Sequence, residues 1–236
     1  MKSMMNTRPG GTLENGLSRP MPRRNFLRYA GVSVVGTGLL AVACTKDDPN
    51  PLTFGQTVNL GSGDIGILNY AYALEQLEAA FYIQVIQTPF SGITDNEKAL
   101  LTDIRDHEVA HREFFKAALG DNAITGLTPN FTAINFADRA SVLGTAKTFE
   151  DLGVSAYNGA GRYITSPEYL TIAGKIVSVE ARHAAYIRNL ISNGSFANSE
   201  VVDANGLDVV RTPTQVIQLA QPFVRNTLDA TNLPIS

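Results

Sequence analysis

The sequence predicts an all-α fold: a four-helix bundle of two helix hairpins joined by a long crossover, with a short helix near the C-terminus. Four segments between residues 64 and 193 repeat apolar side chains at helical spacing, and no long stretch alternates as a strand does. The connections within each half are short, whereas the Gly-, Pro- and Asn-containing segment 121–136 is long enough to cross the bundle. Short connections join antiparallel neighbours, so two hairpins are expected.

The first helix is expected to begin near Asp64, its candidate N-cap, and to end before Pro89, because the residue preceding a proline disfavours helical geometry. The second helix is expected to begin at Thr94 or Asp95, both good N-cap residues, and to stop at Gly120. Together these two helices form the first predicted hairpin.

The third helix is expected over about 137–163, although its four glycines lower its helix propensity. The fourth begins with Pro167 at its first helical position and ends before Gly194. Thr212 and Pro213 form a cap and first-turn pair that opens a short fifth helix. We interpret 194–236 as an extension packing on the bundle; the alternative is that the fifth helix makes a subunit contact in a homo-oligomer.

The first 43 residues have the layout of a signal peptide. Arg23 and Arg24 precede an uncharged stretch from residue 30 to residue 43, which is too short to span a bilayer. The run resembles a twin-arginine signal, with Pro22 where Ser or Thr is usual, and residues 41–44 resemble a lipobox, with its leucine displaced to Leu40. Residues 1–43 are therefore expected to be removed, residues 44–63 to form a tether, and residues 64–193 to form the bundle.

Cys44, the only cysteine, is then explained as the lipid-carrying N-terminus of the mature chain. The alternative is a buried free cysteine in an uncleaved anchor. This interpretation predicts an exported, lipid-anchored protein of the cell envelope, either periplasmic or on the cell surface. Beyond residue 43 the chain has 13 basic and 21 acidic residues, which argues against nucleic acid as a partner.

Two of the three histidines follow a glutamate by three residues, in the pairs Glu108/His111 and Glu180/His183. Residues at this spacing share one face of a helix, and both pairs lie on stripes of otherwise apolar side chains that should face the core. His107 lies to one side of Glu108 and is expected at the surface. Buried carboxylates and imidazoles require mutual pairing or a metal, since an uncompensated buried charge costs several kcal/mol.

The other two long helices each present a glutamate in the same way, and their sequences repeat each other. Glu75 and Glu150 each follow an apolar residue, and Tyr82 and Tyr157 each lie seven residues further on. The tyrosines are expected either to donate hydrogen bonds to ligand carboxylates or to be ordinary core residues. Glu78, one turn after Glu75, is an alternative ligand to it.

Four carboxylates and two imidazoles suit a pair of divalent ions such as iron or manganese. Zinc is less suitable, because six ligands exceed what one tetrahedral zinc ion uses. The remaining alternative is a site without metal, in which the acids and histidines pair directly.

The pattern of one Glu and one Glu-x-x-His motif in each helix pair resembles that of the ferritin-like superfamily. Segments 68–82, 149–160 and 176–188 are similar to ferritin-like domain proteins related to desiccation-associated proteins, and the resemblance spans about 64–223. The resemblance implies six metal ligands: Glu75, Glu108, His111, Glu150, Glu180 and His183. Of these, Glu108 and Glu180 would bridge the two ions.

This superfamily includes storage, oxidation and peroxide chemistry, so the resemblance leaves several functions open. The leading hypothesis is an exported dinuclear iron or manganese protein that reacts with a small oxidant, dioxygen or peroxide, as a ferroxidase, peroxidase or catalase-like enzyme. The alternative is a metal-stabilised, non-catalytic envelope lipoprotein that acts as a binding protein or scaffold. Iron storage in a hollow cage is disfavoured, because the lipid tether and the C-terminal extension would obstruct shell assembly.

Overall fold

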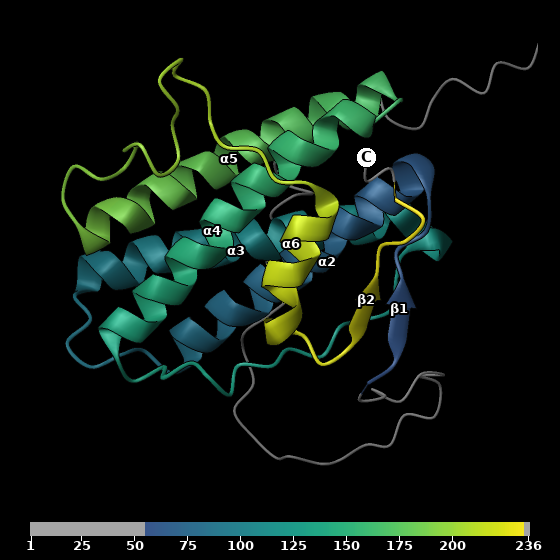
Figure 1. Ribbon diagram of the computed structural model, residues 1–236. Coiled ribbons are helices and arrows are strands. Elements are labelled where there is room, and N and C mark those ends of the chain that lie inside the picture. Colours follow the sequence, from purple (N-terminus) through teal and green to yellow (C-terminus); the bar gives the residue numbers. More distant parts are fainter. Residues whose placement is uncertain (1–54, 234–236) are drawn as a thin grey trace, which may run out of the picture. The chain divides into compact units, whose positions relative to one another are not determined.

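The computed structural model describes residues 55–233. The predicted signal peptide and Cys44 lie outside these residues, as does most of the predicted tether. Four long helices dominate the described chain: α2 (Gly63–Gln87), α3 (Asp95–Leu119), α4 (Arg139–Ala160) and α5 (Pro167–Ile191). Helix α2 contacts α3, α4 contacts α5, and α2 also contacts α4 (Figure 1). The predicted bundle of two hairpins is confirmed.

Local hydrogen bonds explain where the helices begin. Thr94 caps α3 in a capping box with Glu97, and the α4 N-cap, Asp138, accepts a hydrogen bond from the backbone of Ser141. The prediction that Asp64 caps α2 is wrong, because Ser62 occupies the N-cap position. Asp64 instead accepts hydrogen bonds at 2.8 Å from the backbone N–H groups of Thr165 and Ser166. This carboxylate therefore ties the start of α2 to the start of α5.

The third long helix is shorter than the sequence predicted. It begins at Arg139 because Asp138 is its cap, and beyond Ala160 the chain tightens into the 3-10 turn η2 (Gly161–Tyr163). A 3-10 turn is a common way to end an α-helix, since it satisfies some of the last carbonyl groups.

The crossover between the hairpins is anchored to α2 by side-chain hydrogen bonds. It follows the 3-10 turn η1 (Gly120–Asn122) and continues to Asp138. Asn69 of α2 donates to the carbonyl of Asn122 and accepts from the N–H of Ile124, and Gln76 accepts from the N–H of Leu127. Polar side chains on an otherwise buried helix thus satisfy the backbone of the long connection.

A two-stranded parallel sheet, which the sequence did not predict, joins the two ends of the described chain. Strand β1 (Thr57–Asn59) pairs with β2 (Thr227–Asp229). Val58 and Leu60 are buried, so this part of the predicted tether belongs to the packed structure. Each strand has only three residues, too few to show a recognisable alternation.

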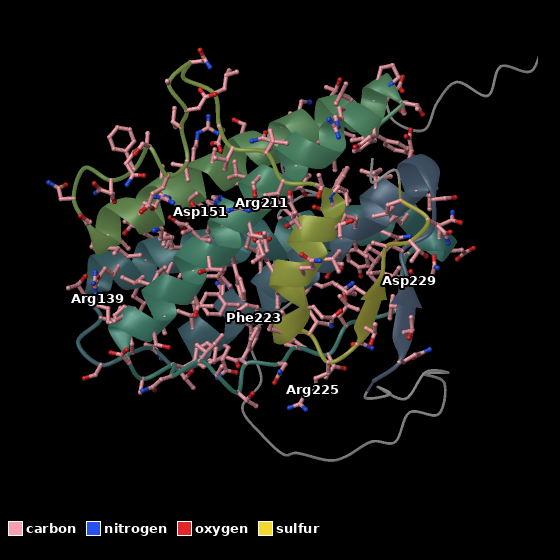
Figure 2. The ribbon with its side chains drawn as sticks, viewed as in Figure 1. Arg139, Asp151, Arg211, Phe223, Arg225 and Asp229 are labelled. Atoms are coloured by element: carbon pink, nitrogen blue, oxygen red, sulfur yellow. The ribbon has the colours of Figure 1, made fainter. Side chains whose placement is uncertain are left out.

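The short helix α6 (Pro213–Ala220) covers α4 (Figure 1). Its Val216 is completely buried, and Phe223 in the following turn η3 (Gln221–Phe223) packs edge-on against Phe149 of α4. Arg211, just before α6, lies beside Asp151 of α4 (Figure 2), and its guanidinium donates to the hydroxyl of Ser155 at 2.6 Å.

Among residues 55–233, no helix has both the length and the apolar character needed to cross a bilayer.

Candidate metal centre

The six side chains implied as ligands meet in the middle of the bundle. The carboxylates of Glu75, Glu108, Glu150 and Glu180 have no exposed surface, while the side chains of His111 and His183 are 12% and 5% exposed. Each long helix turns its apolar stripe inward, and the acids and histidines lie on those stripes. The helices therefore bring together residues that are up to 108 positions apart in the sequence.

The ligand atoms form two overlapping groups. One consists of Glu75, Glu108, His111 and Glu180, and the other of Glu108, Glu150, Glu180 and His183; within each group the atoms lie within 4.8 Å of one another. Glu108 and Glu180, the acids of the two Glu-x-x-His motifs, belong to both groups. Each group thus contains one imidazole, one acid of its own and two shared acids.

Both imidazoles turn Nδ1 toward the carboxylates. The Nδ1 atom of His111 lies 3.0 Å from Oε1 of Glu180 and 3.4 Å from Oε2 of Glu75. The Nδ1 atom of His183 lies 2.8 Å from Oε1 of Glu108. This common orientation makes the two halves of the site equivalent, as the internal sequence repeat suggests.

Most of these ligand atoms lack a hydrogen bond of proper geometry despite their proximity. Both oxygens of Glu108 and of Glu180 are buried and make no hydrogen bond of proper geometry, and the same holds for the Nδ1 atoms of His111 and His183. Buried polar atoms are rarely left unsatisfied in native proteins, since each costs about 1–3 kcal/mol. Ligand atoms that lie within 4.8 Å of one another without hydrogen bonds among themselves are an arrangement that a cation satisfies.

Two tyrosines support the acids by crossing between helices. Tyr82 of α2 donates to Oε1 of Glu150 on α4 at 2.5 Å, and Tyr157 of α4 donates to Oε1 of Glu75 on α2. All four residues are buried. Each tyrosine therefore orients the acid of the opposite repeat and leaves that acid's second oxygen free for the site.

Burial and the crowding of charges shift the protonation equilibria of the cluster. Burial raises the pKa of Glu75 to about 7 and that of Glu180 well above its ordinary value, and the negative charge of Glu108 adds to both shifts. For Glu108 itself the neighbouring imidazoles outweigh burial and lower the pKa to about 2. Adjacent carboxylates likewise outweigh burial at His183 and raise its pKa to about 11. Without a cation the cluster therefore retains protons near neutral pH.

Glu78 is buried next to the two groups but belongs to neither, whereas Glu75 belongs to the first. Burial raises the pKa of Glu78 well above its ordinary value, and the charge of Glu180 raises it further. In the sequence repeat the position of Glu78 corresponds to Gly153. A Cβ at Gly153 would lie 3.1 Å from Oε1 of Glu78 and 3.2 Å from Oε2 of Glu180. The glycine on α4 therefore leaves room for a fifth carboxyl from α2.

His107 contacts the site, which the sequence analysis did not anticipate. Its side chain lies at the surface, as expected, but is partly buried against the site, where its Nδ1 lies 2.9 Å from Nε2 of His183. The imidazole rings of His107 and His183 are nearly parallel, with 5° between their planes and 5.1 Å between their centroids. Because the two facing nitrogens are much closer than the centroids, the rings lie end to end rather than face to face. His107 precedes His111 by four residues, in the pattern H-E-x-x-H. This spacing could have predicted from the sequence that both imidazoles lie on one side of α3.

Comparison with curated proteins returned no match. A family model of the ferritin-like domain matches residues 63–193, more than half of the chain. This span begins with α2, ends just after α5, and includes every residue of both ligand groups. The chain therefore belongs to the ferritin-like domain family.

Proposed function

We propose that the protein is an exported dinuclear iron or manganese protein that reacts with dioxygen or hydrogen peroxide, with ferroxidase, peroxidase or catalase-like activity. The observation that carries this proposal is the pair of buried ligand groups sharing Glu108 and Glu180. A single tetrahedral ion would need only one group of four ligands. Carboxylates shared between two groups favour two neighbouring ions, the arrangement of two-metal catalytic sites.

The charges of the cluster fit this assignment. The four ligand carboxylates carry four negative charges when ionised, which two divalent ions would neutralise. Glu78 is a fifth buried acid beside them. One imidazole and an excess of carboxylate oxygens for each ion suit iron or manganese, whereas zinc more often has a closed set of nitrogen and sulfur ligands.

When bound, the two ions would pass electrons to dioxygen or peroxide. The chain's own residues hold and orient the site. Tyr82 and Tyr157 fix the orientation of the acids to which they donate, and complete burial of the carboxylates keeps bulk water away. In the metal-free protein, burial and the charge of Glu180 raise the pKa of Glu78 and favour its protonated form.

We further propose that the chain belongs to the desiccation-associated branch of the family and is exported after folding. The branch is supported by the resemblance of segments 68–82, 149–160 and 176–188. Export is supported by the twin-arginine-like signal in 1–43 and the lipobox-like residues before Cys44. The mass of the N-terminal peptide of the mature protein tests export and lipidation. An acylated Cys44 is expected, and an unmodified, uncleaved Cys44 would refute this part of the proposal.

The proposed metal site is tested by mass-spectrometric metal analysis of the untagged mature protein, purified from its own host without added metal. About two iron or manganese ions per chain are expected, as in other two-metal sites. The His111→Ala, His183→Ala double variant should lose them. Glu113→Gln, on the exposed side of α3, is the matched control and should retain both ions.

The proposed activity is tested by following the oxidation of added Fe(II) and the loss of hydrogen peroxide. Both the wild type and Glu113→Gln should react, and Glu108→Ala should not, because it removes a shared carboxylate. If metal is bound but none of the proteins reacts, and metal removal only lowers the melting temperature, the protein is the non-catalytic envelope scaffold instead.

A further inference from the structure

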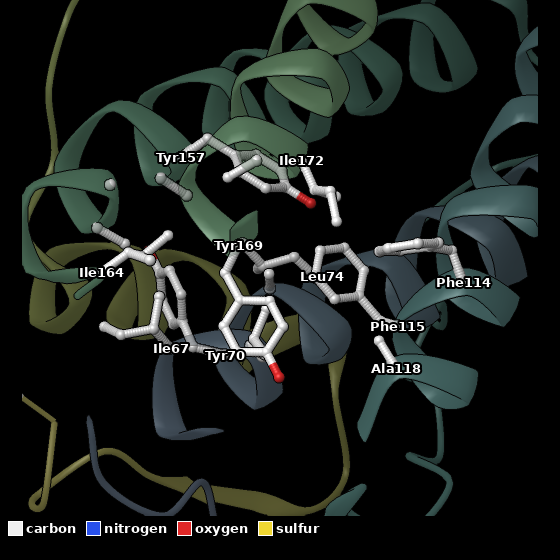
Figure 3. Close-up of a pocket in the computed structure, with 16 residues that line it drawn as sticks. Ile67, Tyr70, Leu74, Phe114, Phe115, Ala118, Tyr157, Ile164, Tyr169 and Ile172 are labelled. Atoms are coloured by element: carbon white, nitrogen blue, oxygen red, sulfur yellow. The ribbon is translucent and has the colours of Figure 1, made fainter. Parts of the chain in front are cut away.

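A small apolar cavity lies at one end of the bundle, enclosed by all four long helices and the turn after α4 (Figure 3). Its walls come from the first half of α2, the end of α3, the end of α4 and the beginning of α5. The centre of a water-sized molecule has about 20 Å³ in which to move. Because about 10–15 Å³ is enough for one such molecule, the cavity has room for one small molecule.

The cavity borders the candidate metal centre directly. Tyr157 forms part of its wall, facing Ile67 and Tyr70 across the space (Figure 3), and the hydroxyl of Tyr157 donates to Glu75. Leu74, another wall residue, immediately precedes Glu75 in α2. A molecule in the cavity is thus separated from a ligand carboxylate by the thickness of one side chain.

The chemistry of the lining disfavours water. The wall consists of Ala, Gly, Ile, Leu, Phe and Tyr and contains no acid, base or amide side chain. Of the three tyrosines in the wall, Tyr157 donates its hydroxyl to Glu75, Tyr70 has a buried hydroxyl without a hydrogen-bond partner, and Tyr169 is partly exposed. A buried water needs two to four polar partners, so a wall whose only polar side-chain atoms are tyrosine hydroxyls is a poor site for water. A larger cavity lined by apolar side chains stays dry and takes up apolar guests such as xenon.

We propose that this cavity is a binding site for dioxygen on its path to the metal centre. The inference rests on the proposed function and narrows its substrate class. Dioxygen is apolar and small enough for the space, whereas hydrogen peroxide carries two hydroxyl groups, and burying these without partners is costly.

The wall that α3 supplies is the part of the cavity nearest the protein surface. Phe114 and Ala118, one helical turn apart, both line it, and both are exposed. The neighbouring Ala117 is also exposed but is not part of the lining. These two adjacent alanines provide a matched pair of positions, at which the same enlargement changes the wall of the cavity in one case and leaves it untouched in the other.

The test uses xenon as the probe in pressurised crystals of the mature protein with its native metal content. Xenon is expected in the cavity of the wild type and of Ala117→Leu. It should be lost in Ala118→Leu or in Ala173→Leu, which fills the cavity from α5. In solution, the variants that lose xenon should oxidise Fe(II) more slowly with dioxygen but at an unchanged rate with hydrogen peroxide.

The two measurements separate this proposal from the proposed function. Absence of xenon from the wild type, or an ordered water in its place, would overturn the cavity assignment even in a protein that oxidises Fe(II). Equal slowing with dioxygen and peroxide would show that the variants act on the metal centre rather than on access. Xenon binding without any redox reaction would refute the proposed function and, with it, the role of dioxygen.

Discussion

Replacing His107 by Ala should weaken one of the two metal positions and leave the other intact. Burial and the nearby imidazoles lower the pKa of His107, so its neutral ring can accept a hydrogen bond from Nε2–H of His183. That bond keeps the proton off Nδ1, the nitrogen facing the carboxylates. Loss of such a partner typically costs about 10- to 100-fold in metal affinity. Because His107 is exposed, water can replace it, and the expected loss is about tenfold, or about 1.4 kcal/mol.

The assay is calorimetric titration of the metal-free protein with Mn(II), resolved into two binding steps. Only the step assigned to His183 should weaken, since within residues 55–233 no corresponding imidazole bonds to His111. His107→Asn, which retains an acceptor near the position of Nδ1, should recover most of the affinity, and Lys98→Ala at the far end of α3 should behave as wild type. Two unchanged steps, or equal weakening of both, would refute this positioning role.

Two further predictions concern stability. Gly159→Ala should lower the free energy of unfolding in urea by about 1–3 kcal/mol, because the added methyl would stand 1.7 Å from the carbonyl oxygen of Arg211 and must displace it. Gly144→Ala on the same helix faces open space and should raise that free energy by up to about 1 kcal/mol, and similar effects of both substitutions would contradict the packing argument. The metal-free protein should lose stability as pH rises from about 5 through 7 and beyond, since Glu75, with its pKa raised to about 7, and Glu180, with a pKa well above 4.5, keep protons that the unfolded chain releases. Melting temperatures across this pH range should fall for the metal-free protein but not for the metal-loaded protein, because the ligands must lose their protons to bind metal. If melting temperature depends on pH in the same way in both forms, the protons and the metal do not share one cluster.

The helices and their inward faces could be predicted because both depend on local spacing. The Glu-x-x-His motifs lie on apolar stripes, and a polar residue on such a stripe is buried in any bundle that buries the stripe. Likewise, Thr94 and Pro167 mark helix starts through interactions within one turn. These features need no knowledge of how the helices are placed relative to one another.

Contacts between distant segments were not predictable in this way. Asp64 is a residue type that favours the N-cap position. Only the position of α5 shows that its carboxylate instead accepts hydrogen bonds from the backbone of Thr165 and Ser166. The pairing of β1 with β2 joins segments 170 residues apart, and two three-residue strands carry no periodic signal.

The sequence by itself therefore determined that two similar helix hairpins would carry four acids and two imidazoles into a common core. Tertiary structure decided how those groups are shared: that Glu108 and Glu180 belong to both ligand groups, that each tyrosine supports the acid of the other hairpin, and that His107 reaches His183. The physical reason is that helical periodicity specifies which face of a helix is buried, whereas the atoms that meet across that face depend on the offset and crossing angle of the packed helices.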